Sequence, residues 1–271
     1  MSDQDELSGY ADIWWQAVND FTDLLEHLSP EQWSAPTDLP GWDVHAVAAH
    51  TAHLEAILAG HPEETVEFEA PQHITGLMGL YTEQGVVARR GRTPGELIDE
   101  IRESATARRT ALLAAPPTDA SAKPPRIFGG VPWNWRTLLR NRPLDVWMHE
   151  QDVRRAVGRP GNLDSPAARH TAAYLAESMP MVVAKRVAAP PGTTVVLEVA
   201  GSRPVCVAIN PEGRGEVLPE PADSPTVRIS TDRETFVLLA GGRRAPEPGS
   251  VTIEGDTGLA QRILDLMAVT P

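Results

Sequence analysis

Two segments far apart in the chain carry side chains that can ligate a metal on helices with an apolar stripe. Residues 42–58 (WDVHAVAAHTAHLEAIL) place apolar residues at helical spacing around His50. Residues 142–158 (RPLDVWMHEQDVRRAVG) place Asp145 and His149 one helical turn apart among apolar neighbours. Two imidazoles and a carboxylate therefore point toward a core. This donor set binds divalent metals such as zinc and leaves one coordination position open for water or substrate.

The cost of burying charge favours a metal over an empty cluster. A bare carboxylate at Asp145 costs several kcal/mol on burial unless a positive charge meets it, and a divalent metal supplies that charge. Two alternatives remain open: His50 is a hydrogen-bonded core histidine, and Asp145 pairs only with His149. On both helices the apolar stripe is interrupted by side chains that can ligate a metal, as in the inward-facing metal sites of helical bundles. His53, one turn from His50, is a candidate to replace or support it, and His45 is expected on the solvated side.

Composition limits the class of protein. The chain has 271 residues, 41% of them hydrophobic, which is enough for two domains with substantial cores. A formal net charge of −13, with arginines dispersed in short pairs, argues against a nucleic-acid partner. No apolar run approaches the ~20 residues of a membrane span, and the first residues are acidic and polar, so we expect a cytoplasmic protein without a membrane partner. The single cysteine, Cys206, excludes an internal disulfide, and its alternating surroundings predict a buried strand residue rather than a nucleophile.

Helical patterns dominate the first two-thirds of the chain. Asp43 is placed to cap the helix that carries His50, and Thr93, followed by Pro94 and Glu96, forms a capping-box pattern. Pro143 is expected to kink the last long helix or to begin a new one. The predicted helices cover residues 7–28, 42–58, 72–90, 93–115, 131–158 and 165–187, with a Pro-rich loop at 115–125.

The pattern changes after a Pro- and Gly-rich segment at 189–192. Alternating, β-branched stretches predict strands, and Gly201-Ser202 suits a hairpin turn between the first two. We therefore expect an α+β protein, with a helical domain over 1–188 and a smaller α/β domain over 189–271 that holds a mostly antiparallel sheet. The predicted strands cover 193–201, 203–210, 224–230 and 250–255, and helices are expected over 231–242 and 257–269.

Three motifs together resemble the mycothiol-dependent maleylpyruvate isomerase family: GWDVHAVAAH at 41–50, DVWMHEQD at 145–152 and LLAGGRR at 238–244. The resemblance implies an N-terminal four-helix bundle of the DinB-like type. It also implies a divalent metal, usually zinc, held by His50, Asp145 and His149. The family usually has glutamate where this chain has Asp145, so the carboxylate arm is shorter by one carbon–carbon bond of ~1.5 Å.

Two further positions follow from the same resemblance. Asp152 matches a family aspartate, and its expected roles are to orient His149, to pair with Arg155 or Arg136, or to lie on the solvated helix surface. Arg243 matches best a family arginine that would act in catalysis by binding a substrate carboxylate, with Arg244 as the alternative assignment.

The implied chemistry is that of a metal-dependent isomerase or S-transferase that uses a thiol. Mycothiol, a low-molecular-weight thiol, would be held as a metal-bound thiolate and would attack an electrophilic small molecule in a cleft between the domains. Two other functions stay open because one fold can host several chemistries. They are a non-enzymatic protein that binds a metal or small molecule, and a metal-dependent hydrolase that activates water. We expect a monomer or a homodimer.

Overall fold

The computed structural model describes residues 2–72, 74 and 76–270, and the chain divides into two compact units, Met1–Asn162 and Leu163–Pro271. The division falls earlier than the expected boundary at 188/189. The boundary lies earlier because α6 (Pro166–Ala176) packs against α8 (Arg233–Ala240) and therefore belongs to the second unit. The predicted helix over 165–187 also divides into α6, a short α7 (Met179–Met181) and a π-helical turn at Val182–Arg186.

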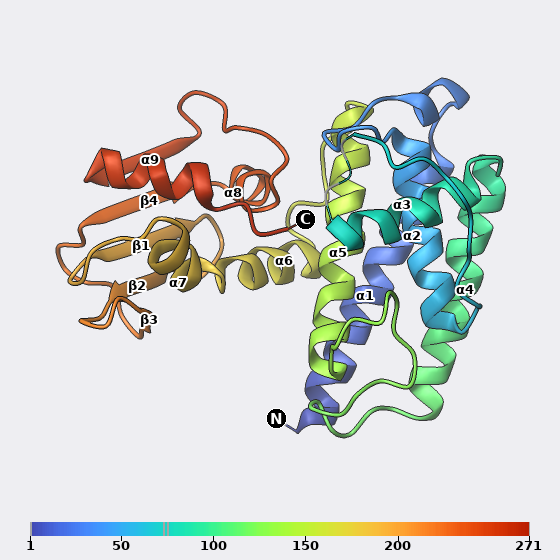
Figure 1. The fold of residues 1–271 in the computed structure, drawn as a ribbon, viewed down its shortest axis with the longest axis horizontal. Helices are drawn as coiled ribbons and strands as arrows, with labels where there is room; N and C mark the ends of the chain where they lie inside the picture. Colours follow the sequence, from blue (N-terminus) through green and yellow to red (C-terminus); the bar gives the residue numbers. More distant parts are fainter. Residues whose placement is uncertain (1, 73, 75, 271) are drawn as a thin grey trace. The chain divides into compact units, whose positions relative to one another are not determined.

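The described part of the first unit is helical. Figure 1 shows α1, α2, α4 and α5 running alongside one another; α1 packs against α4 and α5, and α2 packs against α3, α4 and α5. Large side chains with no exposed surface fill the space between them, including Trp14, Phe21 and Trp147. The helices are α1 (Asp3–Glu26), α2 (Val44–Ala59), α3 (Gly76–Arg89), α4 (Pro94–Ala114) and α5 (Trp135–Ala156), with a 3-10 turn at Pro30–Ser34.

The predicted helix starts are confirmed at two positions. The Asp43 side chain accepts a hydrogen bond from the backbone N–H of Ala46, which fixes where α2 begins. Thr93 and Glu96 form the reciprocal capping box at the start of α4. Pro143 does not begin a new helix, because α5 runs through it as one continuous helix although the ring removes one backbone donor; the kink stays a prediction. Residues 73 and 75 of the predicted helix over 72–90 lie outside the described residues.

The second unit contains a sheet whose described strands have the order β3-β2-β1-β4-β5. Only β1 and β4 pair in parallel among these neighbours, so the expectation of a mostly antiparallel sheet is confirmed. β3 was not among the predicted strands. α9 (Thr257–Leu266) packs against β4 and β5. The strands are β1 (Thr194–Val199), β2 (Val205–Ile209), β3 (Gly215–Leu218), β4 (Val227–Thr231) and β5 (Val251–Gly255).

Local features of this unit agree with the sequence patterns. β1 and β2 form an antiparallel hairpin, and Gly201 in the connecting turn has φ +73°, a conformation that favours glycine. Cys206 is buried on β2, and burial raises the pKa of its thiol, as expected for a packing residue rather than a nucleophile. Among the described residues of the whole chain, no helix combines the length and apolar character that a membrane crossing requires.

Candidate metal centre

The structure brings His50, Asp145 and His149 together inside the first unit. His50 lies on α2, and the other two lie one turn apart on α5. Their potential ligand atoms all lie within 4.8 Å of one another. His50 and His149 are buried, whereas the side chain of Asp145 is 20% exposed. Among the described residues this is the one cluster of three histidine, cysteine or acidic side chains with such spacing.

The distances within this cluster distinguish the sequence-based alternatives. Oδ1 of Asp145 lies 3.8 Å from Nε2 of His50 and 3.7 Å from Nε2 of His149. Both separations exceed hydrogen-bond distance, so the interpretation as a simple Asp145–His149 hydrogen-bonded pair does not hold. They lie near the ~3.3 Å that separates two ligand atoms in tetrahedral coordination at about 2.0–2.1 Å. The arrangement therefore leaves room for a small cation between the three groups.

The second alternative, a hydrogen-bonded core histidine at position 50, finds no support at Nδ1. Nδ1 of His50 is buried and finds no hydrogen-bond partner among the described residues. Such a group is costly in a core whose only purpose is packing. Burial lowers the pKa of His50 despite the opposing effect of Asp145, so the ring is held in the neutral form that ligates metals.

His149 is oriented by a carboxylate on its own helix. Nδ1 of His149 lies 3.2 Å from Oδ2 of Asp152, which has no exposed surface. Arg155 holds the other Asp152 oxygen at 2.6 Å and in turn contacts Asp38 at 2.9 Å. Asp152 thus orients His149 and pairs with Arg155. The alternative partner, Arg136, instead pairs with Glu6, and the solvated placement of Asp152 was wrong.

Trp42 packs over the two imidazoles. Its ring centroid lies 5.0 Å from that of His50 and 6.3 Å from that of His149. The indole N–H donates a hydrogen bond to Glu83 on α3 at 2.8 Å, which fixes the orientation of the ring. Gly41 precedes it with φ +80°, a conformation suited to glycine, and so turns the chain into the start of α2. The Gly-Trp pair therefore places an apolar wall beside the histidines.

Asp145 already has a cationic partner, contrary to the expectation that a metal must supply the positive charge beside it. Nη1 of Arg142 donates to Oδ2 of Asp145 at 2.9 Å, and Nη2 of Arg142 donates to Glu55 at 2.7 Å. Burial alone would raise the pKa of Asp145, but Arg142 and the two imidazoles outweigh it and hold the pKa below its usual range. A metal is therefore not required to neutralise Asp145, and the support for a metal comes from the donor geometry.

Two other histidines of α2 do not join the cluster. His53 is buried, and its Nδ1 faces Glu64 at 3.3 Å and Arg89 at 3.4 Å, so it does not replace His50. His45 is partly exposed, as expected for the solvated side, and its Nε2 contacts the carbonyl oxygen of Arg92 at 2.8 Å.

Arg243 and Arg244 lie in the second unit, just after α8. Arg243 is half-buried and donates from Nη1 to the carbonyl oxygen of Gly241 at 2.8 Å, whereas Arg244 is exposed. The role expected for Arg243 stays a prediction. Sequence reasoning missed Arg142, Glu55 and Trp42 as parts of the site. The available signal was a charged residue, Glu55, within the otherwise apolar 42–58 helix, and an arginine three residues before Asp145.

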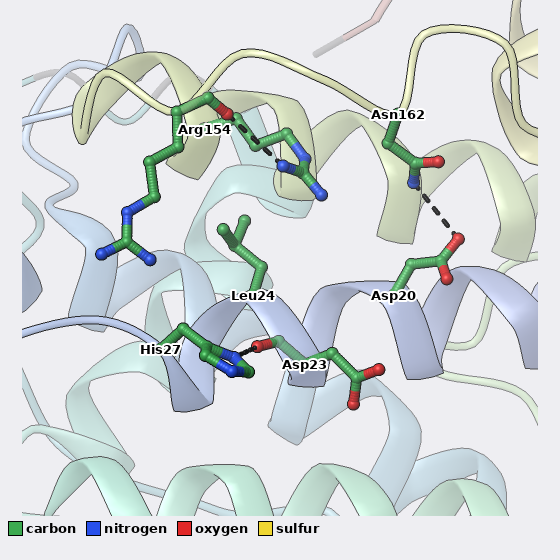
Figure 2. A pocket seen from close by; sticks show the side chains of 7 residues that line it. Asp20, Asp23, Leu24, His27, Arg154 and Asn162 are labelled. Carbon is green, nitrogen blue, oxygen red and sulfur yellow. Dashed lines mark hydrogen bonds between the residues drawn. The ribbon is translucent and has the colours of Figure 1, made fainter.

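A separate cavity of about 480 Å³ lies between the ends of α1 and α5 and does not include the three candidate ligands. Figure 2 shows hydrogen bonds between several of the polar residues that line it. The Asn162 amide donates to Asp20 at 3.2 Å, and Arg154 donates to the Arg159 carbonyl oxygen at 3.4 Å. We therefore regard this depression as a surface feature rather than the reactive site.

Comparison with known proteins agrees with the motifs in both units. A family model described as the mycothiol maleylpyruvate isomerase N-terminal domain matches residues 14–154, more than half of the chain. The chain belongs to this family. A second model, the MDMPI C-terminal domain, matches residues 169–262. The two matches fall within the two structural units and confirm the resemblance of the three motifs to the mycothiol-dependent maleylpyruvate isomerase family.

Solved structures extend the likeness to nearly the whole chain. A solved structure of a mycothiol-dependent maleylpyruvate isomerase shares 18% sequence identity with this chain and has a TM-score of 0.54. The match covers 93% of this chain and 94% of that chain. A histidine-to-alanine variant of such an isomerase is 17% identical, with a TM-score of 0.52 and the same coverage. At these identities the likeness establishes that this member of the maleylpyruvate isomerase family shares the fold. A search of curated proteins found no match.

Proposed function

We propose that the protein is a metal-dependent enzyme that uses mycothiol as a thiol cosubstrate to isomerise a small electrophile. Conjugation of the electrophile with the thiol is the related outcome that the same site supports. The observation that carries this proposal is the placement of His50, Asp145 and His149 around one point without direct hydrogen bonds between them. Family membership and the fold shared with mycothiol-dependent maleylpyruvate isomerase support the choice of thiol. We also infer that α1, α2, α4 and α5 form the DinB-like four-helix bundle.

The residues of the cluster fit a divalent metal, for which we propose zinc. Two imidazole nitrogens and one carboxylate oxygen are a usual donor set of catalytic zinc sites, and they leave one position open. The Asp152 carboxylate on Nδ1 of His149 matches the outer support that metal-binding histidines usually have. When bound, the metal supplies a Lewis acid that lowers the pKa of a coordinated thiol.

The side chains of this chain would contribute orientation, exclusion of water and charge. Asp152 accepts the Nδ1–H of His149 and so leaves Nε2 with its lone pair toward Asp145. Trp42 covers the two imidazoles and keeps water from that side. We propose that Arg243 binds a carboxylate of the substrate through its planar guanidinium, with Arg244 as the alternative.

The proposal is tested with purified protein, mycothiol and maleylpyruvate. We expect isomerisation that requires both the thiol and a bound divalent metal, and a thiolate-to-cobalt absorption band when mycothiol is added to the cobalt-substituted protein. Substrate turnover without thiol would select the alternative of a hydrolase that activates water. Metal binding without a thiolate band and without turnover would select the alternative of a non-enzymatic binding protein.

The ligand assignment is tested separately. His149→Ala should release the metal while circular dichroism shows a folded protein, because the core of the unit is built from apolar side chains elsewhere. His27→Ala is the matched control, since His27 lies at the exposed end of α1 and outside the cluster. Stoichiometric metal in the His149→Ala protein would overturn the assignment.

A further inference from the structure

A line of buried charges of alternating sign ends at the candidate metal centre. Arg142 on α5 and Glu55 on α2 both have 0% exposed surface. Glu55 accepts hydrogen bonds from Arg142, from Trp14 at 3.0 Å and from Arg108 at 3.3 Å. Arg142 then contacts Asp145 at 2.9 Å. The order Arg108, Glu55, Arg142, Asp145 places each charge beside one of opposite sign, which offsets the large cost of burying any of them alone.

The contact with Arg142 makes the two oxygens of Asp145 unequal. Oδ2 accepts the hydrogen bond from Nη1 of Arg142, whereas Oδ1 is the oxygen that faces Nε2 of both His50 and His149. The terminal torsion of an aspartate is broad, so an unsupported carboxylate can turn and present either oxygen or both. The hydrogen bond from Arg142 restricts that freedom, because turning the carboxylate would break the contact at Oδ2.

Arg142 is itself held in place by Glu55. Nε and Nη2 of Arg142 donate to Oε1 of Glu55 at 3.1 and 2.7 Å, while Nη1 is left for Asp145. The guanidinium is planar and its donors form a rigid fork, so fixing two of them on Glu55 fixes the direction of the third. A lysine at this position has a single ammonium group and cannot reproduce that geometry.

We propose that Arg142 is a positioning residue that holds Oδ2 of Asp145 and leaves Oδ1 as the single donor oxygen for the metal. This inference rests on the proposed metal site and adds to it how the carboxylate binds. Arg142 acts through Asp145. Among the hydrogen bonds and ion pairs of the described residues, Asp145 is the one candidate metal ligand that Arg142 contacts.

The first experiment determines the structure of the zinc-loaded wild-type protein. We expect zinc on Oδ1 of Asp145 with the Arg142–Oδ2 hydrogen bond intact. Chelation by both oxygens, or a displaced Arg142, would overturn the inference while leaving the metal site standing. Failure of the wild type to bind zinc or cobalt would overturn the proposed metal site and this inference together.

The second experiment compares Arg142→Lys with Arg154→Lys. Arg154 is a matched control, because it lies on the same helix and pairs with a buried carboxylate, Glu150, away from Asp145. Competition with a chelator should show cobalt affinity reduced about 10–100-fold in Arg142→Lys and unchanged in Arg154→Lys. The visible spectrum of cobalt should also weaken in Arg142→Lys as a second oxygen raises the coordination number. Unchanged affinity and spectrum would refute the role of Arg142, and if Arg142→Lys does not fold, the zinc-loaded wild-type structure decides.

Discussion

Asp152 Oδ2 lies 3.2 Å from Nδ1 of His149, while Arg155 fixes the other oxygen of Asp152 at 2.6 Å. The carboxylate therefore cannot turn away from the imidazole without losing a short ion pair. This arrangement holds His149 in one ring orientation and favours the proton on Nδ1, which leaves Nε2 as the free donor.

Asp152→Asn should weaken metal binding about 10–100-fold without unfolding the protein, because the amide is a poorer acceptor for Nδ1–H and no longer neutralises Arg155. Affinity is measured by competition with a chelator. Asp12→Asn is the control, since Asp12 is 67% exposed and pairs with Arg109 on the surface. Equal affinity in the Asp152→Asn, Asp12→Asn and wild-type proteins would show that Asp152 does not support the site.

Much of the candidate site could be predicted from helical spacing. Asp145, His149 and Asp152 follow one another at intervals of four and three residues, which places them on one face of α5. The same reasoning placed His50 on the inward face of α2. The partner of His50 on another helix could not be derived from spacing, because it depends on how α2 packs against α5.

The sequence did not determine which of several chemically similar side chains would contact one another in the folded protein. His53 and His50 both lie on α2, but Arg89 and Glu64 meet only the former, and that contact depends on segments far along the chain. Arg142 was missed for the same reason, because its burial depends on Glu55 of another helix. β3 was missed because it has only four residues, two of them exposed, with little apolar alternation.

Glu55→Gln should lower the free energy of unfolding of the metal-free protein by about 3–5 kcal/mol. Its side chain has no exposed surface and faces both Arg142 and Arg108, so the loss of its charge leaves two buried guanidinium groups with less compensation. The measurement is urea unfolding in the presence of a chelator. Glu26→Gln, which removes a carboxylate paired with Arg102 on the exposed side of the unit, should change stability by less than about 1 kcal/mol. A similar small change in Glu55→Gln would contradict the importance of the buried charges.

Arg243→Lys should reduce kcat/KM for a carboxylate-bearing substrate more than it reduces metal content. A lysine keeps the positive charge but cannot form the paired hydrogen bonds of a guanidinium with a carboxylate, a difference we expect to be worth about tenfold or more. Arg244→Lys is compared with it, because Arg244 is the alternative assignment at the adjacent, exposed position. A loss of activity confined to Arg244→Lys would move the assignment by one residue, and no loss in either variant would remove both arginines from the proposed function.

His53 should make the first unit less stable in acid. Burial, followed by the charge of Arg89, lowers the pKa of His53 from 6.5 to about 4, although Glu64 and Glu63 act in the opposite direction. The unfolded chain therefore binds a proton between these two pH values that the folded chain does not bind. The free energy of unfolding consequently falls as pH decreases from about 6.5 to about 4.

Replacement by His53→Gln should remove this contribution, so the variant should lose less stability than the wild type over that range, by on the order of 2 kcal/mol. Urea unfolding at several pH values, with a chelator present, measures the difference. His27→Gln is the control because His27 lies at the exposed end of α1. Tyr81 and Gly85 pack directly against the His53 ring and leave no room for a larger side chain. Glutamine is smaller than histidine, so we expect it to fit. If the wild type and His53→Gln lose stability in parallel as the solution is acidified, the acid sensitivity arises from other groups.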